Sequence, residues 1–371
     1  MKINRKSFFK SLAIGTIGLP VFLRTFLGKN FAQSRQQVGA IDGQRHNWKM
    51  VTTWPPNFPI IGEACQLFAD SVEAMSGGRL HIQVYGGGEL VPPLEAFDAV
   101  RTGGAEMASG SAYYWAGKLP SAPFFSTVPF GMNAQQANAW MISGGGLQLW
   151  EELYAPYNLL PMPGGNTGVQ MGGWFNREIN SLADLKGLKM RIPGLGGKVF
   201  ERIGGSPVLM AGSELYTNLE RGVIDATEWL CPFHDNLMGF QEIAKYYYYP
   251  GWHEPGTVLE LLFNKEKFEA LPADLQAILR TAAAQMNIWV LSTMEARNAT
   301  TLAAMIETGV DIRPFPEDVI SELRNQTKQV IKEMTDQDPF TKRVYESYKT
   351  FQQQSNNWAN LSERMYYDSL T

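Results

Sequence analysis

From Trp48 onward the sequence alternates strand-like runs with helix-like runs, and this alternation restricts the fold more than any other feature. Residues 49–54 form the first strand-like run, residues 61–75 carry apolar side chains at helical spacing, and residues 79–85 alternate as a second strand. The Gly77-Gly78 pair ends the helical run. Strand, helix and strand in this order predict a βαβ unit, and similar alternation further along the chain predicts α/β lobes with largely parallel sheets.

The length of the chain predicts more than one lobe. It has 371 residues, of which 44% are hydrophobic, whereas single hydrophobic cores stop growing at about 250–300 residues. We expect a first lobe from residues 41–165 together with about 255–271, and a second lobe from residues 166–254. The hinge is expected where the chain crosses between them.

The remainder of the chain carries helical patterns. Pro272 opens an Ala- and Met-rich stretch that Gly309 ends, which predicts one long helix over 272–310 that bridges the lobes. Residues 311–371 are expected to be a C-terminal helical segment, in which one apolar face must be covered. Packing on its own lobe and packing against a partner chain both satisfy this requirement. The apolar residues of this face are Val344, Tyr348, Phe351, Trp358 and Met365.

Residues 1–40 have the pattern of an export signal. Basic residues up to Lys10 precede an apolar run over residues 12–23 that is too short to span a bilayer. The pair Arg5-Lys6 is similar to a twin-arginine signal with its second Arg replaced, so Sec and Tat export both stay open. We therefore expect a periplasmic protein. Its two cysteines, Cys65 and Cys231, form a disulfide only if the fold brings them together.

Charge and motifs argue against several classes of function. The net charge is −4 and the basic residues are dispersed, so no nucleic-acid surface is expected. Neither a Gly-x-Ser-x-Gly nor a His-Glu-x-x-His motif is present, and the four histidines show no triad or metal-ligand spacing. Two cysteines and four histidines are also too few for a Cys/His metal site of the usual kind. An enzyme is therefore not expected.

Residues 187–194 place one guanidinium, Arg191, at the end of a short apolar strand beside a Pro-Gly turn. A guanidinium binds both oxygens of a carboxylate and stays charged at physiological pH, so this position suits the capture of an organic acid. A structural ion pair is the alternative for a lone Arg at a strand end. As a ligand anchor, Arg191 is expected to be an exposed charge in a cleft, whose removal leaves the fold intact.

Further polar candidates lie in two other segments. Asn166 and Gln170 are four residues apart in a Gly-rich segment, and their amides suit a 2-oxo or 2-hydroxy oxygen or a hard cation, although isolated amides also cap turns. Glu228 and Trp229 follow an apolar run at the expected carboxyl end of a strand, where α/β folds collect ligands. A solvated surface position is the alternative for Glu228.

Aromatic residues make up 12% of the chain, with ten Trp, which suits an aromatic-walled pocket as well as a large core. Residues 246–249 are four consecutive tyrosines, and since strand side chains alternate, at most two of these rings reach a pocket. The candidates for an apolar wall are Tyr113, Tyr114, Trp115, Trp229 and Trp252.

Four segments in fixed order carry a resemblance to a known family: residues 165–175, 187–194, 224–229 and 246–254. From about Trp48 to the C-terminus the chain resembles the DctP-type solute-binding subunits of tripartite ATP-independent periplasmic (TRAP) transporters. The likeness is greatest to the branch that binds 2-oxoacids and 2-hydroxy monocarboxylates such as pyruvate or lactate. It implies a two-lobe periplasmic binding protein fold with a ligand cleft between the lobes.

The resemblance also implies a site and partners. In this branch a cation lies beside the organic acid, and the matching positions here are Gln170, Glu228, the backbone carbonyl of Trp229 and, less directly, Glu254. Oxygen ligands point to sodium or calcium. Residues 253–255 equally fit an exposed loop. A membrane permease is the implied partner, and because some members of the branch swap a C-terminal helix, a homodimer is expected.

Three functions follow from these observations. The leading one is a periplasmic receptor that closes around a small monocarboxylate and delivers it to a permease. The others are an exported enzyme acting on an organic acid and a sensor subunit that presents its ligand to a membrane kinase. A dicarboxylate ligand requires a second inward cation such as Lys198 or Arg202, and we expect both on a solvated helix face.

Overall fold

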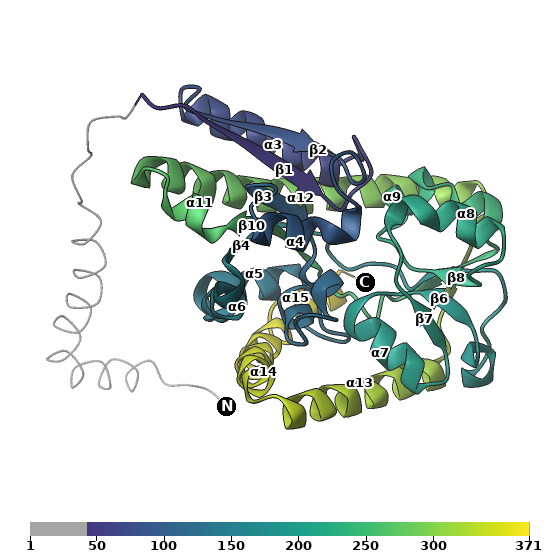
Figure 1. Ribbon diagram of the computed structural model, residues 1–371. Helices are drawn as coiled ribbons and strands as arrows, with labels where there is room; N and C mark the ends of the chain where they lie inside the picture. The colour runs from purple at the N-terminus through teal and green to yellow at the C-terminus, as the bar shows by residue number, and fades with distance from the viewer. Residues whose placement is uncertain (1–42, 371) are drawn as a thin grey trace, which may run out of the picture. The chain divides into compact units, whose positions relative to one another are not determined.

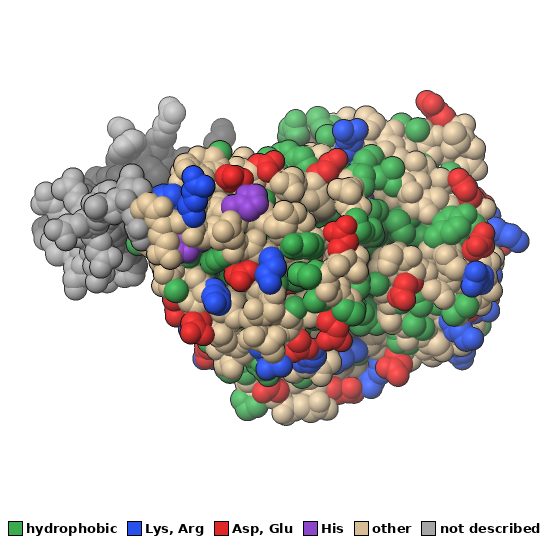
Figure 2. All heavy atoms as spheres, turned by 45° about the horizontal axis from the view of Figure 1, so that its top comes forward, with side chains coloured by type: hydrophobic (Ala, Val, Ile, Leu, Met, Phe, Trp, Pro, Cys, Tyr) green, Lys and Arg blue, Asp and Glu red, His purple; other side chains and the backbone are tan. Residues whose placement is uncertain are grey.

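The computed structural model describes residues 43–370, so the predicted export signal over 1–40 lies outside the described residues. Two separate β-sheets organise the described chain, and helices pack around them (Figure 1). No helix in the described range is long and apolar enough to cross a membrane. On the face drawn in Figure 2, Lys and Arg side chains are interspersed with Asp and Glu, as the dispersed charge of the sequence predicts.

The first sheet has five strands in the order β2-β1-β3-β10-β4. The strands β1 (His46–Thr52) and β2 (Leu80–Tyr85) pair in parallel, and α3 (Ile61–Met75) connects them, which is the predicted βαβ unit. The strand β3 (Met107–Gly110) is also parallel to β1, whereas β10 (Val258–Asn264) runs antiparallel to both β3 and β4 (Leu159–Asn166).

The second sheet has six strands in the order β11-β9-β5-β8-β6-β7. Only β5 runs against its neighbours: it pairs antiparallel with β8 and β9, while the pairs β6–β7, β6–β8 and β9–β11 are parallel. The strands are β5 (Gly173–Phe175), β6 (Lys189–Arg191), β7 (Ser206–Val208), β8 (Ala226–Thr227), β9 (Tyr246–Tyr249) and β11 (Asp311–Pro314).

The prediction of largely parallel sheets is therefore wrong at β5 and β10, and both sheets are mixed. Each of these strands is the one that the chain enters directly from the other sheet, β5 after β4 and β10 after β9. A parallel neighbour is required only where a crossover helix returns the chain to the same sheet. The strand-like runs in the sequence do not show whether a strand is entered from the same sheet or from the other one.

One long helix, α12 (Ala273–Glu307), occupies most of the stretch predicted at 272–310. It packs on β4 and α3 beside the first sheet and on α9 (Pro232–Leu237), which follows β8 of the second sheet. In Figure 1 it runs from the side of α11 (Lys265–Glu269) toward α9. Gly165 allows its close approach to β4, since a Cβ there would lie 3.1 Å from Val290 of α12.

The C-terminal segment is not entirely helical, because residues 311–314 form β11 at the edge of the second sheet. The helix α13 (Glu317–Gln337) then packs on α7 (Gly194–Arg202), and α14 (Pro339–Ala359) packs on α5 (Ala134–Ser143) and α6 (Gly146–Tyr154). A short α15 (Glu363–Asp368) follows as a separate helix, which interrupts the pattern predicted as one face.

The apolar face of this tail is covered only in its first half. Val344 and Tyr348 are buried, and the Tyr348 hydroxyl accepts a hydrogen bond from the backbone N–H of Met132 at 2.7 Å. Trp358 and Met365 are 67% and 55% exposed. The first half therefore packs on α5 and α6 of the same chain, and the second half leaves large apolar side chains in solvent.

The two cysteines are both buried and both free. The thiol of Cys65, on α3, lies 3.3 Å from the carbonyl of Ile61, while that of Cys231 faces the carbonyl of Thr167 at 3.7 Å. The disulfide that the sequence left open is thus not formed.

A buried acid lies inside the first sheet. Glu260 of β10 accepts hydrogen bonds from the indole N–H of Trp115 and, at 3.0 Å, from the hydroxyl of Tyr154. Burial raises the pKa of Glu260 to about 7, against the opposing effect of these two donors. Trp115, a candidate for the pocket wall, therefore belongs to the core of the first sheet.

We expect Glu260→Gln to flatten the dependence of stability on pH. A carboxyl whose pKa is higher in the folded state than in the unfolded chain stabilises the fold at low pH, and this contribution is lost as the pH rises from about 4.5 toward 7. The amide mimics the protonated acid and removes a loss on the order of 1–3 kcal/mol. Urea unfolding at pH 4.5, 6 and 8 measures this change. The exposed Glu266→Gln is the matched control, and identical slopes in both variants would contradict the assignment.

Candidate functional site

Four segments that are far apart in the sequence meet between the two sheets: the ends of β4, β6 and β8 and the loop that follows β9. In the parallel register of β6 and β8, Arg191 lies opposite Thr227, so Glu228 directly follows the paired residue. The backbone N–H of Gln170 donates to the carbonyl of Glu254 at 3.1 Å and so joins the segment after β4 to the loop after β9. Sheet pairing and these crossings thus bring the predicted segments together.

Arg191 is the charged centre of the site. It is only 1% exposed, and its Nη1 forms an ion pair with Oε1 of Glu228. Further donors face the carbonyl of Glu228 at 3.3 Å and the Tyr114 hydroxyl at 3.5 Å. The indole of Trp229 lies over the guanidinium, with its centroid 5.2 Å away. Burial by itself lowers the pKa of Arg191. The nearby groups of Glu228, Tyr114 and Tyr113 act in the opposite direction, and the net effect raises the pKa above the ordinary value for arginine.

The expectation of an exposed cleft charge at Arg191 is therefore wrong. The tyrosines come from the 3-10 helix η2 (Ala112–Trp115) after β3 of the first sheet, and they cover a guanidinium that belongs to the second sheet. The ion pair with Glu228, which was the structural alternative, is present. The sequence could not reveal this cover, because the covering residues are far from Arg191 along the chain.

Glu228 offers one oxygen to Arg191 and one to the rest of the site. Its side chain is fully buried, which excludes the solvated alternative. Oε2 lies 3.4 Å from Nε2 of His253 and has no protein hydrogen bond of good geometry. Burial raises the pKa of Glu228 to about 7, although Arg191 acts in the opposite direction.

Glu254 is a second buried acid, only 2% exposed, so the exposed-loop alternative for 253–255 is wrong for this residue. Its Oε2 accepts hydrogen bonds from Nε2 of Gln170 at 2.7 Å and from the hydroxyl of Thr257. Burial and the nearby charge of Glu228 raise the pKa of Glu254 to about 7.

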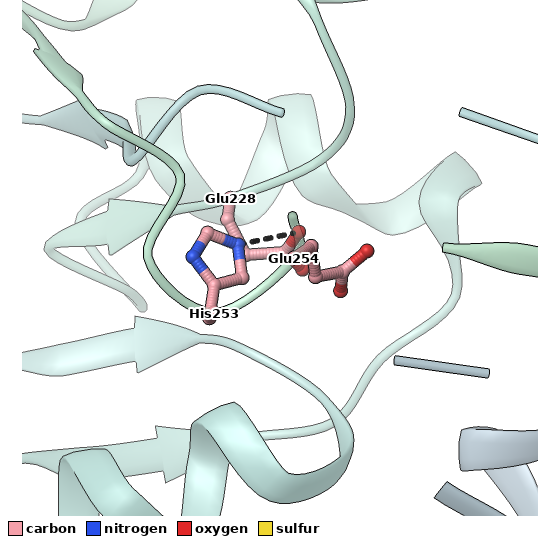
Figure 3. Close-up of side chains that lie close together, drawn as sticks. All are labelled: Glu228, His253 and Glu254. Atoms are coloured by element: carbon pink, nitrogen blue, oxygen red, sulfur yellow. Dashed lines mark ion pairs between the residues drawn. The ribbon is translucent and has the colours of Figure 1, made fainter. Parts of the chain in front are cut away.

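His253 is the site residue that sequence reasoning missed. One ligand atom each from Glu228, His253 and Glu254 lie within 4.8 Å of one another, and Figure 3 shows the imidazole facing Glu228. Burial lowers the pKa of His253 to about 4, so the ring is neutral at neutral pH. The available signal was its place between Trp252 and Glu254. Cys/His spacing does not indicate this residue, because its neighbours in space are carboxylates.

The two amides each serve a turn and each leave a buried polar atom unpaired. Oδ1 of Asn166 accepts a hydrogen bond from the backbone N–H of Gly168 at 2.9 Å, while its Nδ2 has no protein partner. Nε2 of Gln170 is held by Glu254 and by the Thr167 hydroxyl at 3.2 Å, while its Oε1 has none. An unpaired buried polar atom costs about 1–3 kcal/mol, so both atoms could gain a hydrogen bond or an ion contact from a polar ligand.

Aromatic rings close the site. Tyr113 is buried and meets Tyr114 edge to face with centroids 4.8 Å apart. The Cβ of Tyr113 lies where a side chain on Gly194 would stand, and Gly194 has a φ of +60°, so both space and backbone favour glycine there. Trp252 is buried and stacks on Phe130 at 6.0 Å, beside the ring of His253. All the predicted site residues except the half-buried Tyr114 are excluded from solvent.

Other candidates lie away from the site. In β9, Tyr247 stacks on Trp174 at 4.3 Å, and the Tyr248 hydroxyl is bound to the backbone N–H of Ile179. Lys198 and Arg202 are exposed on α7, and Arg202 pairs with Glu333 of α13, as expected for a solvated helix face. These two cations therefore supply no second anchor for a diacid.

Comparison with known proteins supports a specific family. The family model of the bacterial extracellular solute-binding proteins, family 7, matches residues 50–338. The chain is 41% identical to the monocarboxylate 2-oxoacid-binding periplasmic protein of Nostoc sp. PCC 7120 over 86% of this chain and 87% of that one.

Two solved structures are also similar. A TRAP periplasmic solute-binding protein from Pseudoalteromonas atlantica, with bound sodium and pyruvate, is 43% identical with a TM-score of 0.86, over 88% of this chain and 99% of that one. A TRAP solute-binding protein from Bordetella bronchiseptica, a mixed-occupancy dimer with calcium and picolinate, is 35% identical with a TM-score of 0.87, over 88% and 97%.

We expect Arg191→Ala to destabilise the protein, contrary to the expectation from sequence of an intact fold. Removing the guanidinium leaves Glu228 buried without its partner, which costs about 3–5 kcal/mol. The loss should be smaller at pH 5 than at pH 8, because the raised pKa of Glu228 lets it become neutral at the lower pH. Adding Glu228→Gln should restore part of the stability. Chemical unfolding of the single and the double variant measures these effects. A free energy of unfolding of Arg191→Ala within 1 kcal/mol of the wild-type value at pH 8 would refute them.

Proposed function

The chain belongs to family 7 of the bacterial extracellular solute-binding proteins, and from this premise we propose that it is the receptor of a TRAP transporter that binds a small 2-oxo or 2-hydroxy monocarboxylate together with a sodium or calcium ion. One observation carries the proposal of ligand and ion. A buried guanidinium and two buried carboxylates lie together with buried oxygens of Gln170 and Glu228 that have no protein hydrogen-bond partner.

Arg191 is proposed to anchor the carboxylate of the ligand. One Nη is paired with Glu228, and the other faces only the distant hydroxyl of Tyr114, so one edge of the guanidinium keeps donors for an acid. Nδ2 of Asn166 is a buried donor without a protein partner and suits the 2-oxygen. Tyr113, Trp229 and Trp252 exclude water around it, which strengthens each of these charge-assisted hydrogen bonds.

The cation is proposed to bind Gln170, Glu228, the backbone carbonyl of Trp229 and Glu254. The unpartnered Oε1 of Gln170 and Oε2 of Glu228 are oxygen ligands of the kind that sodium and calcium prefer. The neutral imidazole of His253 lies against Glu228, where it orients the carboxylate without adding charge.

Charge balance favours an ion with the acid. With both glutamates ionised, Arg191 leaves one negative charge among the three side chains, and a bound monocarboxylate adds a second. A divalent ion neutralises these two negative charges. A monovalent ion is sufficient when one glutamate is protonated, and the raised pKa of both glutamates permits this protonation. Neutrality matters because an unpaired charge in a buried site is costly.

Closure is the proposed working motion. We propose that residues 41–165 with about 255–271 form one lobe and 166–254 the other, and that the crossings after β4 and β9 act as the hinge. Because the site residues are buried between the two sheets, ligand entry requires the lobes to separate. A permease is then able to distinguish the loaded, closed receptor from the empty one.

We further propose a periplasmic location and no catalytic role. The matched family consists of solute receptors rather than enzymes, and the named relative is a periplasmic protein. Turnover of the bound acid would favour an exported enzyme instead. Capture of a membrane kinase rather than a permease would favour the sensor.

We expect calorimetric titration to show ion-dependent binding of a monocarboxylate. Pyruvate, lactate, longer 2-oxoacids and succinate are titrated into ligand-free protein with sodium, with calcium, or in a sodium-free buffer that contains a chelator, and the protein without either ion should lose at least about tenfold in affinity. Glu228→Gln should weaken the ion dependence, whereas Glu260→Gln, the same change at a buried acid elsewhere, should not. Arg191→Lys keeps a charge beside Glu228 but loses the planar fork, so binding should fall by at least about tenfold. No binding across the panel would overturn the proposed ligand class.

We propose a homodimer in which the exposed apolar residues of the C-terminal segment, including Trp358 and Met365, form the interface. The Bordetella bronchiseptica relative is a dimer. We expect light scattering to report two copies for wild type and one for Trp358→Glu with Met365→Glu, because a charge in an apolar interface must be desolvated. Val223→Glu, at an exposed apolar residue near β8, is the control and should stay dimeric. A monomeric wild type would refute the dimer.

A further inference from the structure

The turn between β1 and α3 carries a strained backbone. Ile60 has φ +60° and ψ −70°, and the backbone N–H of Ile61 donates to the carbonyl of Pro59 at 2.8 Å. These dihedral angles and this hydrogen bond define a γ-turn of the rare kind, in which the central residue has a positive φ. A β-branched residue seldom takes a positive φ, and Asn57 in the same turn has one as well. Such strain persists only where the surrounding structure holds it, and it concentrates at sites that switch.

Residues that follow β8 of the second sheet hold this turn. The ring of Phe58 stacks on the imidazole of His234 with centroids 5.1 Å apart and meets the indole of Trp229 edge to face at 6.0 Å. His234 lies on α9, and Trp229 lies just after β8, whereas the turn follows β1 of the first sheet. The stack is closed to solvent: Phe58 is 8% exposed and His234 is fully buried.

One hydrogen bond ties the two sides together directly. Nε2 of His234 lies 2.9 Å from the carbonyl oxygen of Pro59, and since a carbonyl only accepts, the imidazole carries its proton on Nε2. Burial lowers the pKa of His234 to about 4, so this ring is neutral and its Nδ1 has no partner. The same Pro59 oxygen closes the γ-turn, so the contact from α9 and the strain of Ile60 meet at one atom.

This contact is continuous with the anchor of the binding site. Trp229, which touches Phe58, also lies over the guanidinium of Arg191. Gly212 leaves room for its indole, because a Cβ there would come within 2.3 Å of the ring. Separation of the two sheets would break the Phe58 stack and the His234 hydrogen bond.

We propose that Phe58, Pro59 and His234 form a closure latch, in which the strained turn of the first sheet is held by α9 of the second in the closed receptor only, so that the latch sets how slowly the ligand leaves. The inference rests on the proposed receptor function. Phe58 and His234 are positioning residues, because neither contacts the acid-binding groups except through Trp229. Contacts made only after closure slow dissociation and leave association nearly unchanged.

The kinetic test uses pyruvate with sodium as the probe in stopped-flow tryptophan fluorescence. His234→Phe keeps a ring for stacking but loses the donor, so we expect the dissociation rate to rise about fivefold. Phe58→Leu loses the aromatic stack and should raise it about tenfold. His234→Asn retains a donor and should act more mildly than His234→Phe if its amide reaches Pro59. Association rates should stay within about twofold of wild type.

A matched control separates a latch from general packing. Phe268→Leu makes the same change at a buried ring beside the first sheet that contacts Phe263 and not α9. It should lower the unfolding midpoint without raising the dissociation rate. Latch variants that fold and release pyruvate at the wild-type rate would overturn the proposal, as would a control that accelerates release equally.

A second measurement distinguishes failure of the latch from failure of the proposed function. Spin labels carried by non-natural residues at the exposed positions Gln83 and Glu220 report the distance between the two sheets in the absence of ligand. The ligand-free protein samples the closed form as part of its ensemble, and His234→Phe and Phe58→Leu should lower the population of that form, which shifts the distribution toward longer distances than in wild type. If wild type binds no acid, the proposed function fails, while these distances still test the latch. An unchanged distribution of distances in both variants overturns the latch.

Discussion

The buried ion pair between Arg191 and Glu228 is the interaction on which the rest of the site depends. Two charges that leave water together are tolerated only with close geometry and further hydrogen bonds. The parallel pairing of β6 and β8 supplies the geometry, because it places the residue after Thr227 beside Arg191. Carbonyls of Met210 and Glu228 and the indole of Trp229 supply the remaining contacts. A guanidinium held in this way is rigid, which suits a site that must recognise a planar carboxylate.

The same pair explains why the neighbouring acids are arranged as they are. Glu228 has one oxygen committed to Arg191, so only the other is available to a ligand or ion, and it faces His253 and Glu254. Gln170 and Thr257 hold Glu254 by hydrogen bonds, which keeps two buried carboxylates near one another at the cost of raised pKa values. In the proposed site a cation bound there relieves the repulsion. Ligand, ion and ion pair would then form one electrostatic unit, which the surrounding aromatic rings would strengthen by excluding water.

Much of the local structure could be predicted from the sequence. The helix at 61–75, its flanking parallel strands and the long helix beginning after Pro272 follow from apolar spacing and from Gly and Pro, which act within a few residues. The reversed strands β5 and β10 and the edge strand β11 could not be predicted, because strand direction and partner depend on which sheet the chain enters next. The split of the tail into α14 and α15, with Trp358 exposed, likewise depends on what lies beside it.

By itself the sequence determined which chemical groups were available: a single guanidinium at a strand end, amides four residues apart, and an acid followed by Trp at the end of another strand. Residue type and spacing are sufficient for that, because they set charge, donor count and strand periodicity. Only the tertiary structure decided that Arg191 and Glu228 pair in the dry interior, that His253 joins the two acids, and that Phe58 in the turn after β1 meets His234 on α9. These facts depend on desolvation and on contacts between segments tens to hundreds of residues apart, and no local pattern encodes either.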